Sequence, residues 1–204
     1  MILRMNVGSP FARKVRMLAH EKGLTGEIEE SVVTVSPVHT NEALARENPL
    51  IKMPVLVLDN GEYLYGSAVI CEYLDTLHQR TKAFSEGGFG RFATLRRQAL
   101  CDGMLEAAIL CRYELALRPA ELRWNEWIEG QKAKVFGGLS VFESEVDAWG
   151  DEFELAQIEL TCVLGYLDFR FAEGSWRVFY PHIARWHEGI STRSSVIATA
   201  PEQH

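Results

Sequence analysis

The stretch that decides the fold of this chain is Asn48-Pro49-Leu50-Ile51-Lys52-Met53-Pro54-Val55-Leu56-Val57-Leu58. Its second half, Val55 to Leu58, is apolar and prone to strand formation, and the Asn60-Gly61 pair that follows is a strong hairpin signal. Tyr63-Leu64-Tyr65 then predicts the returning strand. Ser67 stands where a helix N-cap is expected, because apolar residues follow it at helical spacing. The stretch therefore predicts strand, turn, strand and helix in succession.

The residues before this stretch predict the rest of the same sheet. Ile2 to Val7 is a short apolar strand, and Ser9-Pro10 begins a helix with a serine N-cap and a proline at its first position. Ile28 to Val35 is rich in β-branched residues and predicts a second strand, parallel to the first by the right-handed crossover rule. Residues 36–47 fit either a weak helix or an irregular crossover. We expect a thioredoxin-like α/β domain over residues 1–78.

The second half of the chain carries helical patterns and no strand pattern. Residues 79–88 are polar and rich in glycine, which predicts a linker. Apolar residues at helical spacing then run from Phe89 to about Leu117. In a later helical pattern, Gly137-Gly138 costs about 1 kcal/mol per glycine relative to alanine, and either a close helix approach or a kink would explain the pair. We predict an all-α domain over residues 89–204, with a disordered end from Ala200.

Length and composition exclude several classes of protein. The 204 residues are 47% apolar, enough for a substantial core, and 28 acidic against 21 basic residues give a net charge of −7. That charge argues against a nucleic-acid or anionic-membrane partner. No apolar run reaches the length of a membrane span or a signal peptide, so we expect a soluble, cytoplasmic protein. The four cysteines and six histidines lack metal-binding spacing, which predicts buried, reduced cysteines and no metal.

The residues around Pro54 resemble the glutathione-binding half of the glutathione S-transferase family. The resemblance is carried by Lys52-Met53-Pro54-Val55-Leu56, the short hairpin and the serine at the helix start. In that family the proline is cis, the residue before it offers its backbone to the cysteinyl part of glutathione, and the serine binds the γ-glutamyl carboxylate. The resemblance therefore implies that Met53, Pro54 and Ser67 bind glutathione as co-substrate. It also implies that Lys52 reaches the glycyl carboxylate, although a solvated surface lysine explains this residue equally well.

Ser9 is the candidate catalytic residue. It lies at the N-terminus of a predicted helix, where free N–H groups and the helix dipole favour an anion. A hydroxyl that donates to a bound thiolate contributes about 1.5–3 kcal/mol, which lowers a thiol pKa by about one to two units. Taken alone, a simple N-cap is the more frequent explanation of Ser9. The resemblance implies the activating role, because several classes of the family carry Ser or Cys at this helix start.

Serine at this position also argues against disulfide exchange. Ser9-Pro10-Phe11-Ala12 occupies the place where thioredoxin-like redox proteins carry Cys-Pro-x-Cys or Cys-Pro-x-Ser. Disulfide exchange requires a thiolate nucleophile, which serine does not supply. The sequence therefore disfavours a glutaredoxin-type activity.

Gly66 departs from the family pattern. Many members place Glu, Gln or Asp directly before the serine, where it helps to hold the γ-glutamyl amine, and Gly66 has no side chain to do this. We expect a positive φ at Gly66, because the chain turns there from a strand into a helix. Because Gly66 lacks a side chain for the γ-glutamyl amine, we expect either weaker glutathione binding or a different ligand. The resemblance further implies an electrophile pocket between the domains, for which we predict Phe11, Arg112 and Tyr113 as lining residues.

Two functions are compatible with these residues. The first is a glutathione transferase that conjugates the glutathione thiolate to a small hydrophobic electrophile, as a homodimer, the family's usual state. The alternative is a non-catalytic glutathione-binding or protein-interaction module with the same fold. Ser9-Pro10 and Met53-Pro54 favour the first. Gly66 favours the second, as do Glu154 and Gln157, which replace the capping box that family members usually carry at a helix start.

Overall fold

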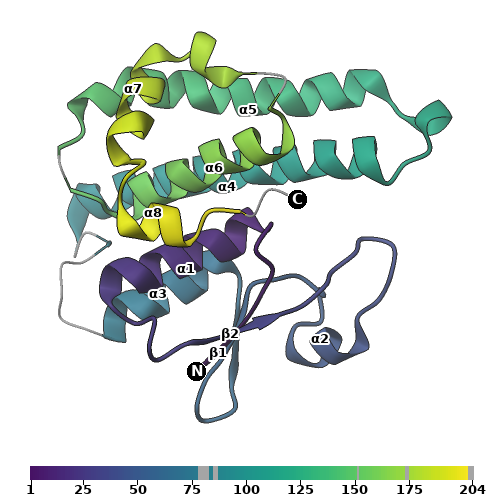
Figure 1. The fold of residues 1–204 in the computed structure, drawn as a ribbon, viewed down its shortest axis with the longest axis vertical. Coiled ribbons are helices and arrows are strands. Elements are labelled where there is room, and N and C mark those ends of the chain that lie inside the picture. Colours follow the sequence, from purple (N-terminus) through teal and green to yellow (C-terminus); the bar gives the residue numbers. More distant parts are fainter. Residues whose placement is uncertain (78–82, 85–86, 151, 173–174, 202–204) are drawn as a thin grey trace. The chain divides into compact units, whose positions relative to one another are not determined.

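The computed structural model describes residues 1–77, 83–84, 87–150, 152–172 and 175–201, and it divides into two units (Figure 1). The first unit comprises Met1–Glu86 and Ser194–His204, and the second comprises Gly87–Arg193. The predicted linker, residues 79–88, and the predicted disordered end from Ala200 lie largely outside the described residues. The predicted division of the chain differs from these units in one respect, because its last segment groups with the first unit.

The first unit is built on a four-stranded mixed sheet with the order β2-β1-β3-β4. The strands are β1 (Ile2–Met5), β2 (Glu29–Val32), β3 (Val55–Val57) and β4 (Tyr63–Tyr65). β1 pairs parallel with β2, as the crossover rule predicts, whereas β3 runs antiparallel to both β1 and β4. This arrangement confirms the predicted thioredoxin-like α/β fold.

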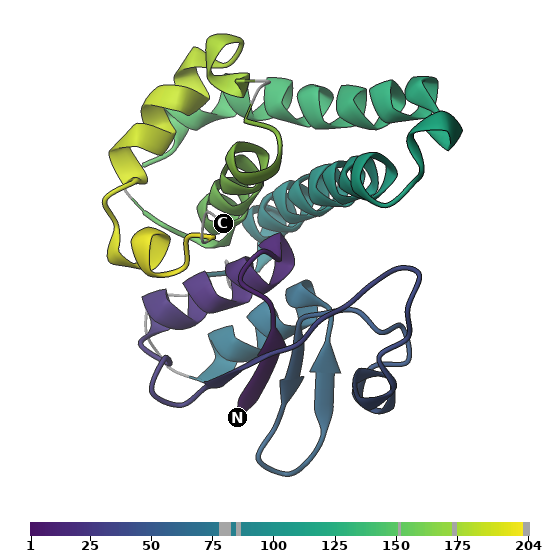
Figure 2. The same ribbon diagram turned by 45° about the vertical axis from the view of Figure 1, so that its right-hand side comes forward.

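The first unit also contains the helices α1 (Pro10–Lys22), α2 (Glu42–Glu47), α3 (Ser67–Leu77) and α8 (Ser194–Ala198). α1 and α3 pack against each other on one face of the sheet, and α2 lies on the side away from them (Figure 2). Side chains alternate between the two faces of a strand. In β1, Leu3 and Met5 are accordingly buried, whereas Arg4 points to the opposite face and binds Glu47 at the end of α2.

The short helix α8 packs against α1. The buried guanidinium of Arg13 donates hydrogen bonds to the Val196 carbonyl at 3.2 Å and to the Thr199 hydroxyl at 3.4 Å. The prediction assigned these residues to the helical domain because they follow its helical patterns along the chain, and the sequence does not show which element they pack against. In the structure, the buried arginine on α1 bonds directly to this segment.

A buried ion pair joins α1 to α3. Lys22 Nζ contacts the Asp75 carboxylate, and the two side chains are only 3% and 6% exposed. The same carboxylate accepts backbone hydrogen bonds from Ala83 at 2.8 Å and from Phe84 at 3.3 Å. Asp75 therefore ties two helices to the chain segment that follows α3.

The described residues of the second unit form helices joined by turns and loops, and none of them lies in a strand. The unit contains α4 (Gly88–Ala116), α5 (Asn125–Glu145), α6 (Leu155–Arg170) and α7 (Pro181–Ile190), with short 3-10 turns at Ala120–Leu122, Val146–Ala148 and Trp176–Val178. α4 packs along both α5 and α6 (Figure 1). These bounds confirm the predicted helical region. No helix within the described ranges is both long and apolar enough to cross a membrane. All four cysteines are buried, as expected.

The Gly137-Gly138 pair lies inside the continuous helix α5, where only the second glycine faces α4. A Cβ at Gly138 would lie 2.2 Å from the sulfur and 2.6 Å from the Cγ of the buried Met104, whereas a Cβ at Gly137 would meet nothing within 4 Å. Of the two explanations for the pair, close helix approach therefore applies to Gly138.

This difference makes the two glycines a matched pair of mutation sites. We expect Gly138→Ala to destabilise the protein by about 1–3 kcal/mol, because Met104 must move within a packed core. Gly137→Ala should stabilise it by about 0.5–1 kcal/mol, since alanine is the better helix former and the position is open. Urea unfolding of both variants measures the difference, and equal midpoints would contradict the close approach.

Candidate functional site

Ser9 is the N-cap of α1, as predicted. Its Oγ accepts a hydrogen bond from the Ala12 N–H at 3.3 Å, and its backbone has the extended conformation of a cap, with φ −87° and ψ 118°. Pro10 occupies the first helical turn. The Arg13 N–H donates to the Ser9 carbonyl at 2.9 Å, which closes the first helical turn.

The cap leaves the hydroxyl hydrogen of Ser9 available. A serine oxygen accepts through lone pairs and donates through its single O–H. The cap uses a lone pair, and the described residues provide no acceptor for the O–H. The side chain is half-buried. The capping role and a hydrogen bond donated to a ligand thiolate are therefore compatible in one residue.

The loop before Ser9 is shaped by Asn6, a residue that the sequence interpretation did not single out. Asn6 Oδ1 accepts from the Gly8 N–H at 3.0 Å, and the Asn6 carbonyl accepts from the Ser9 N–H at 2.9 Å. Its Nδ2 donates to the Val33 carbonyl at 3.5 Å. An asparagine two residues before a glycine is typical of an Asx turn, and this pattern could have identified Asn6 from the sequence.

The second part of the candidate site is the loop that leads into β3. The Met53-Pro54 peptide bond is cis, which confirms the prediction for Pro54. Pro54 is buried and Met53 is half-buried, whereas the Lys52 side chain is exposed. Within the described parts of the chain, the backbone N–H and C=O of Met53 make no hydrogen bond. They remain available to pair with an extended ligand.

The third part is the start of α3. Gly66 has φ +87°, as predicted, and its carbonyl accepts from the Ile70 N–H at 3.1 Å. The helix begins at Ser67 itself, so the prediction of Ser67 as N-cap is wrong and Gly66 takes the capping position. The left-handed backbone of Gly66 allows the helix to start at Ser67, one residue earlier than predicted. The Ser67 hydroxyl has no hydrogen-bond partner among the residues described. It lies in the first turn, where the helix dipole favours an anion.

The predicted pocket residues belong to different units. Phe11 lies on α1 of the first unit, where its ring centroid is 5.6 Å from Lys14 Nζ. Arg112 and Tyr113 lie half-buried on α4 of the second unit. Arg13, also on α1, bonds to the C-terminal segment.

Tyr166 on α6 joins Arg112 and Tyr113 in the second unit. It is 6% exposed, and burial raises its pKa to about 12, although the charges of Arg170 and Arg112 oppose the shift. A tyrosine hydroxyl is protonated at neutral pH even at its ordinary pKa, and the raised pKa keeps Tyr166 a hydrogen-bond donor at higher pH as well. The sequence carried no signal for Tyr166, because an aromatic residue on a helix face usually belongs to the core.

Comparison with known proteins relates both units to one family. Residues 8–77 match the model of the glutathione S-transferase N-terminal domain, and residues 125–189 match that of the C-terminal domain. The uncharacterised GST-like protein YibF of Escherichia coli K12 is 32% identical over 95% of this chain and 95% of its own length. The chain belongs to the glutathione S-transferase family.

Solved structures of other glutathione transferase family members share this fold over their full length. One from Pseudomonas fluorescens Pf-5, with bound glutathione, is 42% identical, has a TM-score of 0.96 and aligns over 98% of each chain. A second structure from that organism contains S-(propanoic acid)-glutathione. It is 40% identical, has a TM-score of 0.92 and aligns over 98% of this chain and 99% of its own. The fold of this transferase family member is thus the one predicted from its sequence.

Proposed function

We propose that this chain is a glutathione transferase in which Ser9 activates the thiol of glutathione. The observation that carries the proposal is the Ser9 hydroxyl, which caps α1 through its oxygen and keeps its hydrogen for a ligand. Family membership supports glutathione as that ligand. The solved relative from P. fluorescens with bound glutathione adds to this support.

Glutathione would bind as an extended peptide along the first unit. The backbone of Met53 would pair with the cysteinyl residue, in the manner of a strand added to a sheet edge. The Ser67 hydroxyl and the N-terminal amides of α3 would bind the γ-glutamyl carboxylate, because both donate hydrogen bonds to an anion. The exposed Lys52 would reach the glycyl carboxylate at the other end.

The reaction is a nucleophilic substitution or addition by sulfur. Because the Ser9 O–H donates a hydrogen bond to the sulfur, the thiol of bound glutathione loses its proton to solvent at a lower pH than the thiol of free glutathione does. The thiolate then forms a C–S bond with the electrophile, and the electron pair of the bond that breaks leaves with the leaving group or remains on the electrophile. Ser9 stays bonded to the sulfur and does not itself become covalently modified.

Phe11, Arg112 and Tyr113 remain our proposed contacts for a small hydrophobic electrophile. Phe11 offers an apolar ring, and Tyr166 adds a protonated hydroxyl to the two α4 side chains. The relative that contains S-(propanoic acid)-glutathione holds an S-substituted glutathione, the type of product that such a reaction forms. Detoxification in the cytoplasm would be the corresponding role.

Retention on immobilised glutathione, followed by a conjugation assay with an aryl halide, tests the proposal. A glutathione transferase should be retained, be eluted by free glutathione and form the S-aryl product. Retention without product would support the alternative, a non-catalytic binding module. Absence of retention would contradict both functions.

Gly66 offers a test of how the γ-glutamyl amine is bound. A Cβ at this position would meet only Val69 Cγ2, at 4.0 Å, so a side chain has room. At φ +87°, however, any residue with a Cβ at this position has a strained backbone. We expect Gly66→Glu to lower the free energy of unfolding by about 1–2 kcal/mol. It should tighten glutathione binding by no more than about fivefold, because a partly exposed ion pair contributes at most about 1 kcal/mol. Denaturant unfolding and calorimetric titration measure the change in stability and the change in affinity. Unimproved binding would refute the view that Gly66 costs this chain a contact to the γ-glutamyl amine.

We also propose a homodimer. Large aromatic side chains are exposed in both units, among them Tyr63 and Tyr65 at 44%, Phe92 at 66% and Phe89 at 86%. Burial of such surface between two subunits would lower the free energy of both. Sedimentation at micromolar concentration should give twice the 23.1 kDa mass of one chain, and a monomer would refute this proposal.

A further inference from the structure

The loop that carries the candidate glutathione contacts is held in a strained conformation. Ile51 has φ +52°, and it is the one non-glycine residue with positive φ in the described ranges. This region is unfavourable for a residue with a Cβ, and more so for a β-branched one. Strained residues persist where surrounding contacts hold them, and they cluster at ligand-binding sites. Ile51 lies two residues before Met53 and its cis peptide bond.

The contacts that hold this loop converge on Asn48. The Asn48 side chain accepts from the Leu50 N–H at 3.1 Å through Oδ1 and donates to the Lys52 carbonyl at 2.9 Å through Nδ2. Its backbone carbonyl accepts from the Ile51 N–H at 2.9 Å. Three consecutive residues are therefore bonded to one asparagine, which is only 2% exposed.

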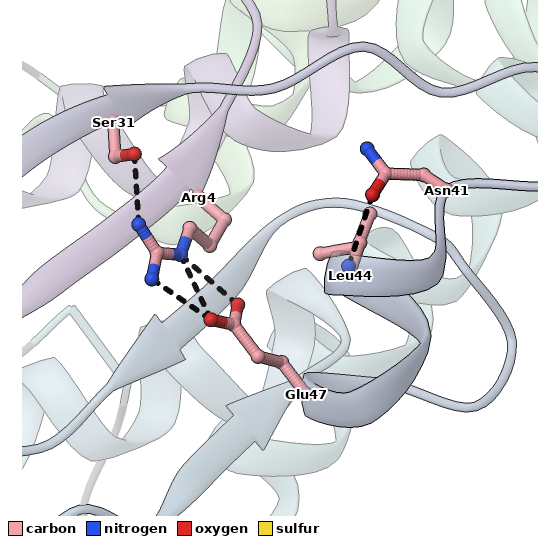
Figure 3. A network of polar contacts seen from close by, with 5 residues as sticks. All are labelled: Arg4, Ser31, Asn41, Leu44 and Glu47. Carbon is pink, nitrogen blue, oxygen red and sulfur yellow. Dashed lines mark hydrogen bonds and ion pairs between the residues drawn. The ribbon is translucent and has the colours of Figure 1, made fainter.

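Asn48 is itself fixed to the sheet through α2. Its N–H donates to the Leu44 carbonyl at 2.8 Å at the end of that helix. Its neighbour Glu47 binds Arg4 of β1, with Nη2 at 2.8 Å and Nε at 3.0 Å from carboxylate oxygens (Figure 3). Arg4 also donates to the Ser31 hydroxyl of β2 at 2.9 Å, and the hydrogen bond to Glu47 raises the pKa of Arg4. The loop is thus connected, through Asn48, Glu47 and Arg4, to the strands β1 and β2.

The bond to the Lys52 carbonyl determines the direction of the next N–H. The Lys52–Met53 peptide is planar and trans, so its N–H points opposite to its C=O. Because Asn48 Nδ2 binds that carbonyl, the Met53 N–H points away from Asn48 and stays free of partners within the described chain. That N–H is one of the groups proposed to pair with glutathione.

We propose that Asn48 is a positioning residue for glutathione, which sets the orientation of the Lys52–Met53 peptide without touching the ligand. This inference rests on the proposed function. Asn48 does not contact the Ser9 hydroxyl or the sulfur, so it acts on the binding of glutathione and not on the chemical step.

Asn41, at the other end of α2, provides a matched control. Its side chain makes the same two kinds of bond, accepting from the Leu44 N–H at 3.1 Å and donating to the Thr34 carbonyl at 3.1 Å. Figure 3 shows the first of these bonds beside the Arg4–Glu47 pair. An Asn41→Ala variant therefore loses two hydrogen bonds of the same kinds at the other end of the same helix, and neither of them involves residues 48–54.

The experiment compares Asn48→Ala with Asn41→Ala and the wild type. We expect the glutathione Kd and the KM for glutathione to rise about tenfold or more in Asn48→Ala, with kcat at saturating glutathione changed less than about threefold. Asn41→Ala should change both by less than about twofold. A loss of kcat at unchanged KM, or equal effects in the two variants, would overturn the proposal. Failure of the wild type to bind glutathione would instead overturn the proposed function first.

Two further measurements apply if Asn48→Ala does not fold. Asn48→Asp is nearly isosteric and keeps the acceptor for Leu50 but loses the donor to Lys52 at neutral pH, so it should show the same rise in Kd. In the wild type, glutathione should slow hydrogen exchange of the Leu50 and Ile51 amides, which bond to Asn48, more than that of the Leu44 and Ala45 amides, which bond to Asn41. Equal protection at both ends of α2 would refute the positioning role.

Discussion

Conjugation by a Ser9→Ala variant is expected to be about ten- to a hundredfold slower than by the wild type, the kinetic equivalent of one charge-assisted hydrogen bond. The hydroxyl hydrogen that Ser9 keeps for the thiolate is absent from alanine, so less of the bound thiol is ionised. The fold should persist, although loss of the bond to Ala12 costs about 1 kcal/mol of stability. Steady-state kinetics with saturating glutathione and an aryl halide measures the effect.

Ser9→Asp separates the two roles of this residue. Aspartate is a good N-cap and an acceptor for the Ala12 N–H, but at neutral pH it cannot donate a hydrogen bond to a thiolate. We expect Ser9→Asp to unfold at a denaturant concentration no lower than the wild type and to lose at least as much activity as Ser9→Ala. If activity instead follows stability across the two variants, Ser9 acts only as a cap.

The largest expected loss of stability follows from Asp75→Asn. The change removes the negative charge opposite Lys22, whose side chain is only 3% exposed. Removing one partner of a buried ion pair costs up to about 3–5 kcal/mol. The amide oxygen also bonds more weakly than the carboxylate to the Ala83 and Phe84 N–H groups. Urea unfolding monitored by circular dichroism should show the shift in midpoint.

Two controls define the origin of that loss. Glu129→Gln breaks the ion pair between Glu129, whose side chain is 68% exposed, and Lys132, whose side chain is 41% exposed. This change should cost no more than about 1 kcal/mol. Adding Lys22→Met to Asp75→Asn also removes the buried positive charge and should recover a large part of the stability. A double variant no more stable than the single one would show that the buried charge is not the cause.

Sequence reasoning succeeded where one residue type determines local geometry. The positive φ at Gly66 and the Ser9 cap each depend on the chemistry of that residue and its immediate neighbours. The cis bond at Pro54 was instead implied by the family resemblance, because an X–Pro bond taken alone favours trans. The order of strands and helices in the first unit followed from hydrophobic periodicity and the crossover rule.

Sequence reasoning failed where a contact joins residues far apart in the chain, and where two neighbouring residues are both acceptable in the same structural position. The packing of α8 depends on Arg13, which lies more than 180 residues earlier in the chain. Asn6 and Asn48 resemble ordinary turn asparagines, and only the structure shows which carbonyls they bind. The start of α3 was misplaced by one residue, because glycine with a left-handed backbone and serine are both acceptable at a helix N-terminus.

The pKa of bound glutathione's thiol tests the central claim most directly, and the ultraviolet absorbance of the thiolate measures it. In the wild-type complex the pKa should lie about one to two units below that of free glutathione, and Ser9→Ala should reverse most of this shift. If the pKa of the bound thiol equals that of free glutathione, or is lowered equally in both proteins, Ser9 does not activate the thiol.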